Sequence, residues 1–285
     1  MRFFTAAFGE THRMAITGLM RSLERYDSEI SLTVFTDLPN AFPNSEIASM
    51  DELLSTRESF YRRPGRRNVF KLALFATMFE RYPGESIAWV DADVLVLGNL
   101  ETHLHPDKVN VIAHGRRDAE EVPLGNGLKV PGSRYAIGGL FSLPDPSWLE
   151  PMNRIADERP TWNHKDHNSD LGDQLILNHV LSEVSADQIH WLTDDRRFIF
   201  NLEIADGLHP YVGDERLSKI TRSGDALYLE DRRIVLFYWI KKQFDLHVAN
   251  GFETFKPDVR RLFVDLYASQ EPPRHSLLRR LTIRR

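Results

Sequence analysis

The chain has 285 residues, with an apolar fraction of 42%, a charged fraction of 27% and a formal net charge of −5. This length suits one large α/β domain, or one domain with a small appendage, in an ordinary soluble protein. The charge gives no reason to expect nucleic acid, and the absence of cysteine excludes disulfides, thiolate metal sites and a cysteine nucleophile. No apolar run approaches the roughly 18 residues of a membrane span and no signal core follows Met1, so the expected location is cytoplasmic.

The N-terminal segment predicts a strand, a helix and a second strand. Arg2 to Phe8 is short and apolar, as a strand would be, and Thr11 is placed to cap the helix that follows. Ser31 to Thr36 predicts the second strand. This order is typical of a βαβ unit, which implies a parallel sheet.

An arginine-rich connection precedes the next predicted helix. The helix is expected from Asn68 to about Tyr82, where Pro83 and Gly84 end it. The connection, residues 61–67, contains four arginines. They either face a diphosphate or an acidic acceptor, or they belong to a solvated loop.

Two carboxylates interrupt the apolar stretch from Ile87 to Leu97. The apolar runs on either side of Asp91 and Asp93 predict a strand buried on both faces. In extended backbone, two residues that are two positions apart point to the same side, where like charges repel and are costly to desolvate. A Mg²⁺ or Mn²⁺ ion removes both problems and leaves positions open for phosphate. The alternative is a pair of solvated acids in a turn.

The middle of the chain predicts further strands around a loop. Residues 110–113 read as a strand, and residues 120–134 read as a mobile loop because they are rich in glycine and proline. Residues 135–143 predict a strand with a glycine pair at Gly138 and Gly139. Such a pair indicates either close approach of the backbone to a ligand or a bulge without one.

The remaining segments contribute a histidine pair, a helix and two strands. His164 and His167 are three residues apart and either bind metal or belong to a polar stretch. A helix is expected over residues 171–181, and strands over residues 188–192 and 233–240.

Two motifs give the chain a family resemblance. They are Val-Asp-Ala-Asp-Val-Leu-Val-Leu-Gly-Asn-Leu, from Val90 to Leu100, and Asp-Gln-Leu-Ile-Leu-Asn, from Asp173 to Asn178. Their order and separation resemble the nucleotide-diphospho-sugar glycosyltransferases of the GT-A fold, and most of all the family 8 type. The resemblance runs to about Ala249. It implies an α/β fold with a Rossmann-like, mixed, mainly parallel central sheet flanked by helices, with residues 1–256 as the catalytic domain and residues 257–285 as a C-terminal helix and basic tail.

The resemblance also implies roles for individual residues. Asp173 and Gln174 would flank the anomeric carbon and the acceptor hydroxyl, and Asp91 and Asp93 would hold Mn²⁺ or Mg²⁺ against the donor diphosphate. The other residues implied at the donor are Thr5, Ala6, Ala7, Lys71, Ala92, Lys241 and Lys242.

This sequence departs from the family pattern in two strands. Ile137 stands near the position of a family asparagine. Phe237 stands where the family has a histidine that binds the metal, which leaves His247 as the candidate third ligand.

The resemblance implies a metal-dependent transferase that moves a hexose from a nucleotide sugar, with UDP as the first nucleotide to test, to a hydroxyl of a glycan or lipid-linked saccharide. The resemblance to family 8 implies retention of configuration. One alternative is a phosphatase of the haloacid dehalogenase type, with Asp91 as nucleophile; another is a non-catalytic relative that binds sugar nucleotides. The basic end of the chain, residues 274–285, is expected either to dock on an anionic membrane or to be a tail without that role.

Overall fold

The structure is a computed structural model. It describes residues 1–27, 29–38, 42, 45–47, 70–113, 121–125, 127–158, 172–192, 198–199, 220–229, 231–238 and 257–267. The arginine-rich connection, the histidine pair at 164 and 167, and the basic tail lie outside these residues. In the part of the chain that is described, no helix is long and apolar enough to cross a membrane.

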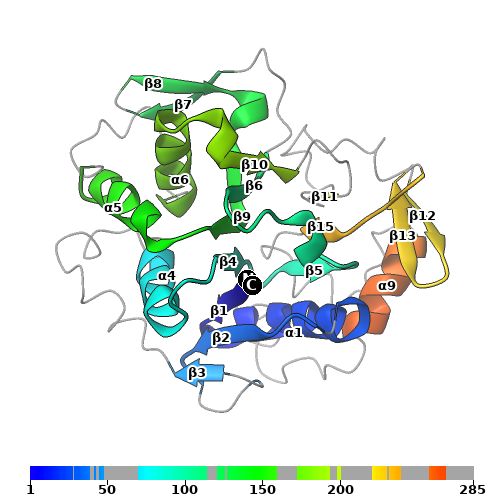
Figure 1. Cartoon of the computed structure of the whole chain (residues 1–285). Helices are drawn as coiled ribbons and strands as arrows, with labels where there is room; N and C mark the ends of the chain where they lie inside the picture. Colours follow the sequence, from blue (N-terminus) through cyan, green and yellow to red (C-terminus); the bar gives the residue numbers. More distant parts are fainter. Residues whose placement is uncertain are drawn as a thin grey trace, which may run out of the picture.

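A mixed seven-stranded sheet forms the centre of the molecule, in the order β10-β6-β9-β4-β1-β2-β3 (Figure 1). Only β9 runs antiparallel to its neighbours β4 and β6, and the other pairs are parallel. The predicted α/β fold with a mainly parallel sheet is therefore confirmed. The strands are β1 (Arg2–Ala7), β2 (Leu32–Thr36), β3 (Ser45–Ile47), β4 (Ile87–Val90), β6 (Val109–Ala113), β9 (Ala136–Leu143) and β10 (Ile189–Trp191).

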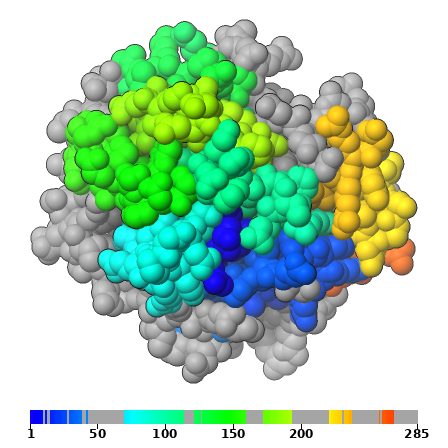
Figure 2. Space-filling model, viewed as in Figure 1, coloured from blue at the N-terminus to red at the C-terminus, as the bar shows by residue number. Residues whose placement is uncertain are grey.

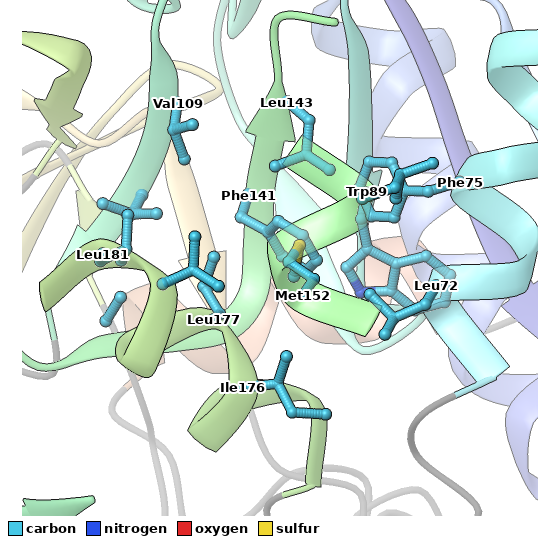
Figure 3. Packing of buried hydrophobic residues seen from close by; sticks show 14 of the residues in the cluster. Leu72, Phe75, Trp89, Val109, Phe141, Leu143, Met152, Ile176, Leu177 and Leu181 are labelled. Atoms are coloured by element: carbon cyan, nitrogen blue, oxygen red, sulfur yellow. The ribbon is translucent and has the colours of Figure 1, made fainter. Parts of the chain in front are cut away.

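Helices cover both faces of this sheet because its strands are apolar on both sides. On β4, Trp89 packs in the cluster formed with α4 (Phe70–Arg81), α5 (Leu149–Glu158) and α6 (Gly172–Glu183), whereas Val90 packs in the cluster formed with α1 (Gly9–Tyr26). Neighbouring strand residues point to opposite faces, so the two clusters lie on opposite sides of the sheet. Figure 3 shows the first cluster, where Trp89 lies beside Leu72. In Figure 2, α4, α5 and α6 form a continuous surface in cyan to yellow-green.

A second group of strands extends the fold beyond β4. A three-stranded sheet has the order β11-β15-β5, and an antiparallel sheet has the order β12-β13-β14. The strands of these two sheets and the last helix are β5 (Val94–Val96), β11 (Phe198–Ile199), β12 (Ile220–Ser223), β13 (Ala226–Leu229), β14 (Arg232–Arg233), β15 (Leu236–Tyr238) and α9 (Pro257–Tyr267). Helix α9 packs on α1 where Gly18 gives Tyr267 room, since a Cβ at Gly18 would lie 1.8 Å from the Tyr267 hydroxyl. The domain boundary at residue 257 stays a prediction.

Three local expectations were wrong. The expected loop at residues 120–134 contains a hairpin of β7 (Glu121–Gly125) and β8 (Leu128–Pro131), whose turn places Gly125 and Gly127 at positive φ. Helix α1 begins at Gly9 with Phe8 as its N-cap, so Thr11 lies inside the helix. The expected strand at 233–240 is divided between β14 and β15.

Short 3₁₀ helices cover Glu101–His103, Gly132–Arg134, Pro146–Trp148 and Ala186–Gln188.

Candidate active site

A turn follows β4 and carries the two acids of the first motif. The Val94 amide donates to the Asp91 carbonyl at 3.1 Å, which closes the turn and separates β4 from β5. The extended backbone expected through Asp91 and Asp93 was therefore wrong, because β4 and β5 belong to different sheets and the chain must bend between them. Asp91 lies just beyond the carboxyl end of β4, and Asp93 is 2% exposed.

Lys71, in the first turn of α4, joins this turn to α6. Its Nζ lies 3.0 Å from Asp91 Oδ1 and 2.6 Å from Asp173 Oδ2, and it donates to the Gly138 carbonyl at 3.0 Å. Lys71 and Asp173 are each 7% exposed. The structure thus brings together three predicted site residues from three separate elements. We call Lys71, Asp91 and Asp173 the lysine cluster.

The electrostatics of this cluster keep Lys71 charged. Burial by itself lowers the pKa of the Lys71 ammonium, but the nearby carboxylates of Asp173 and Asp91 outweigh burial and raise the pKa above its ordinary value of 10.5. A protonated Lys71 balances one of the two carboxylates that it bridges. The lysine cluster therefore has two acids and one base.

Helix α6 supplies Asp173 and fixes the glycine pair of β9. Gln174 Oε1 accepts a hydrogen bond from the Gly138 amide at 3.1 Å. Asn178 bonds the backbone of Ala136 through both ends of its amide group, at 2.7 Å each. These contacts join the first turns of α6 to β9, so the second motif positions this strand as well as presenting Asp173.

The glycine pair lies where β9 has an irregular register against β6. Val111 pairs with Phe141, but Ile112 pairs with Ile137, so β9 has additional residues at this point. A Cβ built on Gly138 would lie 3.0 Å from Asp173 Oδ2 and 3.6 Å from Lys71 Nζ. The backbone of Gly138 therefore comes close to the lysine cluster, and a side chain at this position would require Asp173 or β9 to shift.

Trp89 is a site residue that the sequence analysis missed. Its Nε1 donates to Asp91 Oδ1 at 2.7 Å, and Lys71 Nζ lies 4.5 Å from the centroid of its ring. The available signal was the spacing, since residues 89 and 91 are two positions apart at the end of a strand and point to one face.

The residues expected along the nucleotide lie at the end of β1, next to β4. Thr5, Ala6 and Ala7 are buried, and β1 pairs with β4 through Phe4 and Trp89. The Thr5 hydroxyl has no hydrogen-bond partner among the described residues. The strand thus ends near the lysine cluster, while its contact with a nucleotide stays a prediction.

The chemistry of the donor set fits a hard divalent cation in part. Mg²⁺ is often held by one or two carboxylates together with phosphate oxygens, which Asp91 and Asp93 match. Among the described residues no group of three His, Asp or Glu side chains forms a metal site. The expected third ligand His247, and Lys241 and Lys242 with it, lie outside the residues that the structure describes.

Comparison with known proteins gives a match in structure but none in sequence. No protein-family model and no curated protein matches the sequence. The fold matches the crystal structure of the galactosyltransferase LgtC in complex with donor and acceptor sugar analogs, with a TM-score of 0.53 over 96% of this chain and 98% of that chain. The chain has the GT-A glycosyltransferase fold. At 12% identity, the match establishes the fold and leaves the roles of individual residues as predictions.

A second structure with some likeness to this chain is the apo form of the bifunctional glycosyltransferase WbbM. It covers 70% of this chain and 39% of its own, at 13% identity and a TM-score of 0.44. This value is too low to add to the argument. The match to LgtC alone confirms the predicted resemblance to GT-A glycosyltransferases, at the level of the fold.

Proposed function

We propose that the protein is a glycosyltransferase that moves a hexose from a nucleotide-diphosphate sugar to a hydroxyl of a glycan or lipid-linked saccharide. UDP is the leading candidate for the nucleotide, and the transfer retains the configuration at the anomeric carbon. The observation that carries this proposal is the lysine cluster, in which Lys71 bridges Asp91 and Asp173 at the carboxyl end of β4. In open α/β sheets, ligands bind beyond the carboxyl ends of the strands.

Each member of the lysine cluster has a chemical role in such a transfer. Asp173 supplies fixed negative charge near a centre that becomes oxocarbenium-like as the bond to the leaving group breaks. Lys71 supplies fixed positive charge, which stabilises negative charge on a donor oxygen. Groups that are already oriented need no reorganisation during the reaction, and this is the usual source of large electrostatic effects in catalysis.

The donor diphosphate would lie beside Asp91 and Asp93, which would hold Mn²⁺ or Mg²⁺. When bound, the ion would act as a Lewis acid that neutralises the leaving diphosphate. The turn after β4 sets the backbone at Asp91 and Asp93, and Thr5, Ala6 and Ala7 would line the nucleotide from the neighbouring strand.

The decisive experiment measures nucleotide binding and slow donor hydrolysis. Calorimetry with UDP and GDP, with Mn²⁺ and with EDTA, tests the metal, and a panel of nucleotide sugars tests the donor. We expect binding that requires the ion, and hydrolysis of one donor. If UDP or GDP binds as tightly in EDTA as with Mn²⁺, Asp91 and Asp93 are not metal ligands. If neither nucleotide binds, the transferase proposal is wrong.

Asp173→Asn separates catalysis from helix capping. Asp173 lies in the first turn of α6, where an acid is also favourable for the helix alone. A catalytic role predicts a fall in kcat of about 10²-fold or more with UDP affinity retained. A capping role predicts near-normal turnover and about 1 kcal/mol of lost stability.

The phosphatase and the non-catalytic relative make different predictions for the same protein. A haloacid dehalogenase-type enzyme would hydrolyse phosphate monoesters, with Asp91 as the nucleophile. Asp91 Oδ1, however, is held by both Lys71 and Trp89. A non-catalytic relative would bind UDP with Mn²⁺ but hydrolyse no donor.

A further inference from the structure

Trp89 presents two different surfaces to the lysine cluster. Its indole N–H donates to Asp91 Oδ1 at 2.7 Å, while the face of its ring lies 4.5 Å from Lys71 Nζ. The first contact is a hydrogen bond to a charged acceptor, and the second is a cation–π interaction. One side chain therefore contacts both the anion and the cation of a buried ion pair.

The indole itself is held in place by the core. Trp89 is 2% exposed, and its ring makes edge-on contacts with Phe4 at a centroid distance of 5.2 Å and with Phe70 at 6.1 Å. Phe4 comes from the neighbouring strand β1, and Phe70 is the first residue of α4, directly before Lys71. The ring is thus fixed from two sides, so its N–H has one direction available.

Two donors converge on a single oxygen of Asp91. Lys71 Nζ lies 3.0 Å from Oδ1, and Trp89 Nε1 lies 2.7 Å from the same atom. A carboxylate with one oxygen held by two N–H groups from different elements cannot rotate about its Cβ–Cγ bond without breaking both contacts. The direction of its other oxygen is then fixed by the core rather than by the turn after β4.

We propose that Trp89 is a positioning residue, which orients the Asp91 carboxylate for a divalent cation and keeps the Lys71 ammonium beside it. This inference rests on the proposed function, because it assumes that Asp91 is a metal ligand. Partners that orient a metal ligand typically contribute about 10- to 100-fold to metal affinity or activity. Trp89 touches neither donor nor acceptor in this role and acts only through Asp91 and Lys71.

The test compares Trp89→Phe with Trp148→Phe. Phenylalanine at 89 keeps a ring face for Lys71 but removes the N–H that holds Asp91. Trp148 is half-buried against the same core cluster, so its replacement controls for the loss of indole atoms. Mn²⁺ affinity and Mn²⁺-dependent UDP affinity are measured by calorimetry, with thermal melting to confirm folding. We expect a loss of about 10-fold or more in Mn²⁺ affinity for Trp89→Phe and no change for Trp148→Phe.

The outcomes distinguish this inference from the proposed function. If the wild-type protein binds Mn²⁺ and UDP and Trp89→Phe binds them equally well, the positioning role is wrong and the transferase proposal stands. If the wild-type protein binds neither, both are wrong. If Trp89→Phe fails to fold, Trp89→Tyr takes its place, since tyrosine restores part of the volume while its hydroxyl projects from another part of the ring. The same loss of Mn²⁺ affinity is expected, and wild-type affinity would overturn the proposal.

Discussion

Two ion-pair clusters in this molecule differ mainly in how far their acidic side chains are exposed to water. In the lysine cluster, the side chains of Lys71, Asp91 and Asp173 are at most 13% exposed. The second cluster, which we call the arginine cluster, joins α1, the β12–β13 hairpin and α9. Its acids are 63% and 38% exposed. It consists of Arg25 and Arg222 with Asp225 and Asp265.

This difference in exposure changes what each ion pair contributes to the stability of the fold. Exposed pairs contribute about 0–1 kcal/mol because water screens them and their side chains lose freedom on pairing. A buried pair gains more attraction but loses hydration, so its net contribution is small, while removing one partner costs about 3–5 kcal/mol. A buried pair is therefore weak evidence for stability. A functional site is indicated instead by the position of the lysine cluster beyond the carboxyl end of β4.

Lys71→Met gives the largest expected effect, because it leaves Asp91 and Asp173 buried without their cation. We expect the free energy of unfolding to fall by about 3–5 kcal/mol in urea titrations near neutral pH. Lys129→Met is the matched control, since Lys129 pairs with Glu121 at 2.9 Å on the surface. A loss below about 1 kcal/mol for Lys71→Met would mean that the buried cluster behaves like an exposed one.

Gly138→Ala changes the lysine cluster without removing a charge. The new methyl group would lie 3.0 Å from Asp173 Oδ2, so the carboxylate or β9 must move. We expect a loss of about 1–3 kcal/mol in stability, as for other overpacked sites. Gly98→Ala is the control, because its nearest neighbour, Val235 Cγ2, lies at an ordinary 3.5 Å. Equal stability of the two variants would contradict the close approach of β9 to the cluster.

Alkaline pH should reduce the difference between the wild-type protein and Lys71→Met. The pKa of Lys71 is raised in the folded protein above its ordinary value of 10.5, so its stabilising effect is complete below that pH and declines as the pH rises. Above it, the unfolded chain releases this proton while the folded chain keeps it. We expect the gap in unfolding free energy to narrow by about 1 kcal/mol or less between pH 8 and pH 11. A gap that widened would show that the pKa is not raised.

Asp225→Asn gives the smallest expected effect, because Asp225 is 63% exposed and both Arg25 and Arg222 keep Asp265 as a partner. The loss of stability should be about 0–1 kcal/mol and should disappear at high salt. Urea titrations at low and high ionic strength measure this. A loss as large as that of Lys71→Met would show that the arginine cluster is effectively buried.

Much of the fold followed from local sequence patterns. Apolar runs and helical spacing predicted β1, β2, β6, β9 and β10 and the helices α1, α4 and α6, and two motifs predicted the GT-A fold. These features depend on neighbours within a few residues, so periodicity and composition are sufficient to reveal them. The same patterns placed Asp91 at the end of β4 and Asp173 in the first turn of α6.

The joining of these residues was decided by the tertiary structure. Lys71, Asp91, Gly138 and Asp173 come from four elements spread over about a hundred residues, and no local pattern states which side chains meet. The turn between β4 and β5, the reversed direction of β9 and the contact of Trp89 with Asp91 likewise depend on which strands pair and how helices pack on them. The carboxylates of Asp173 and Asp91 then keep Lys71 charged despite its burial, because solvation and neighbouring charges are properties of the folded arrangement. The sequence specifies the side chains that carry charge, and their packing determines which of them act together.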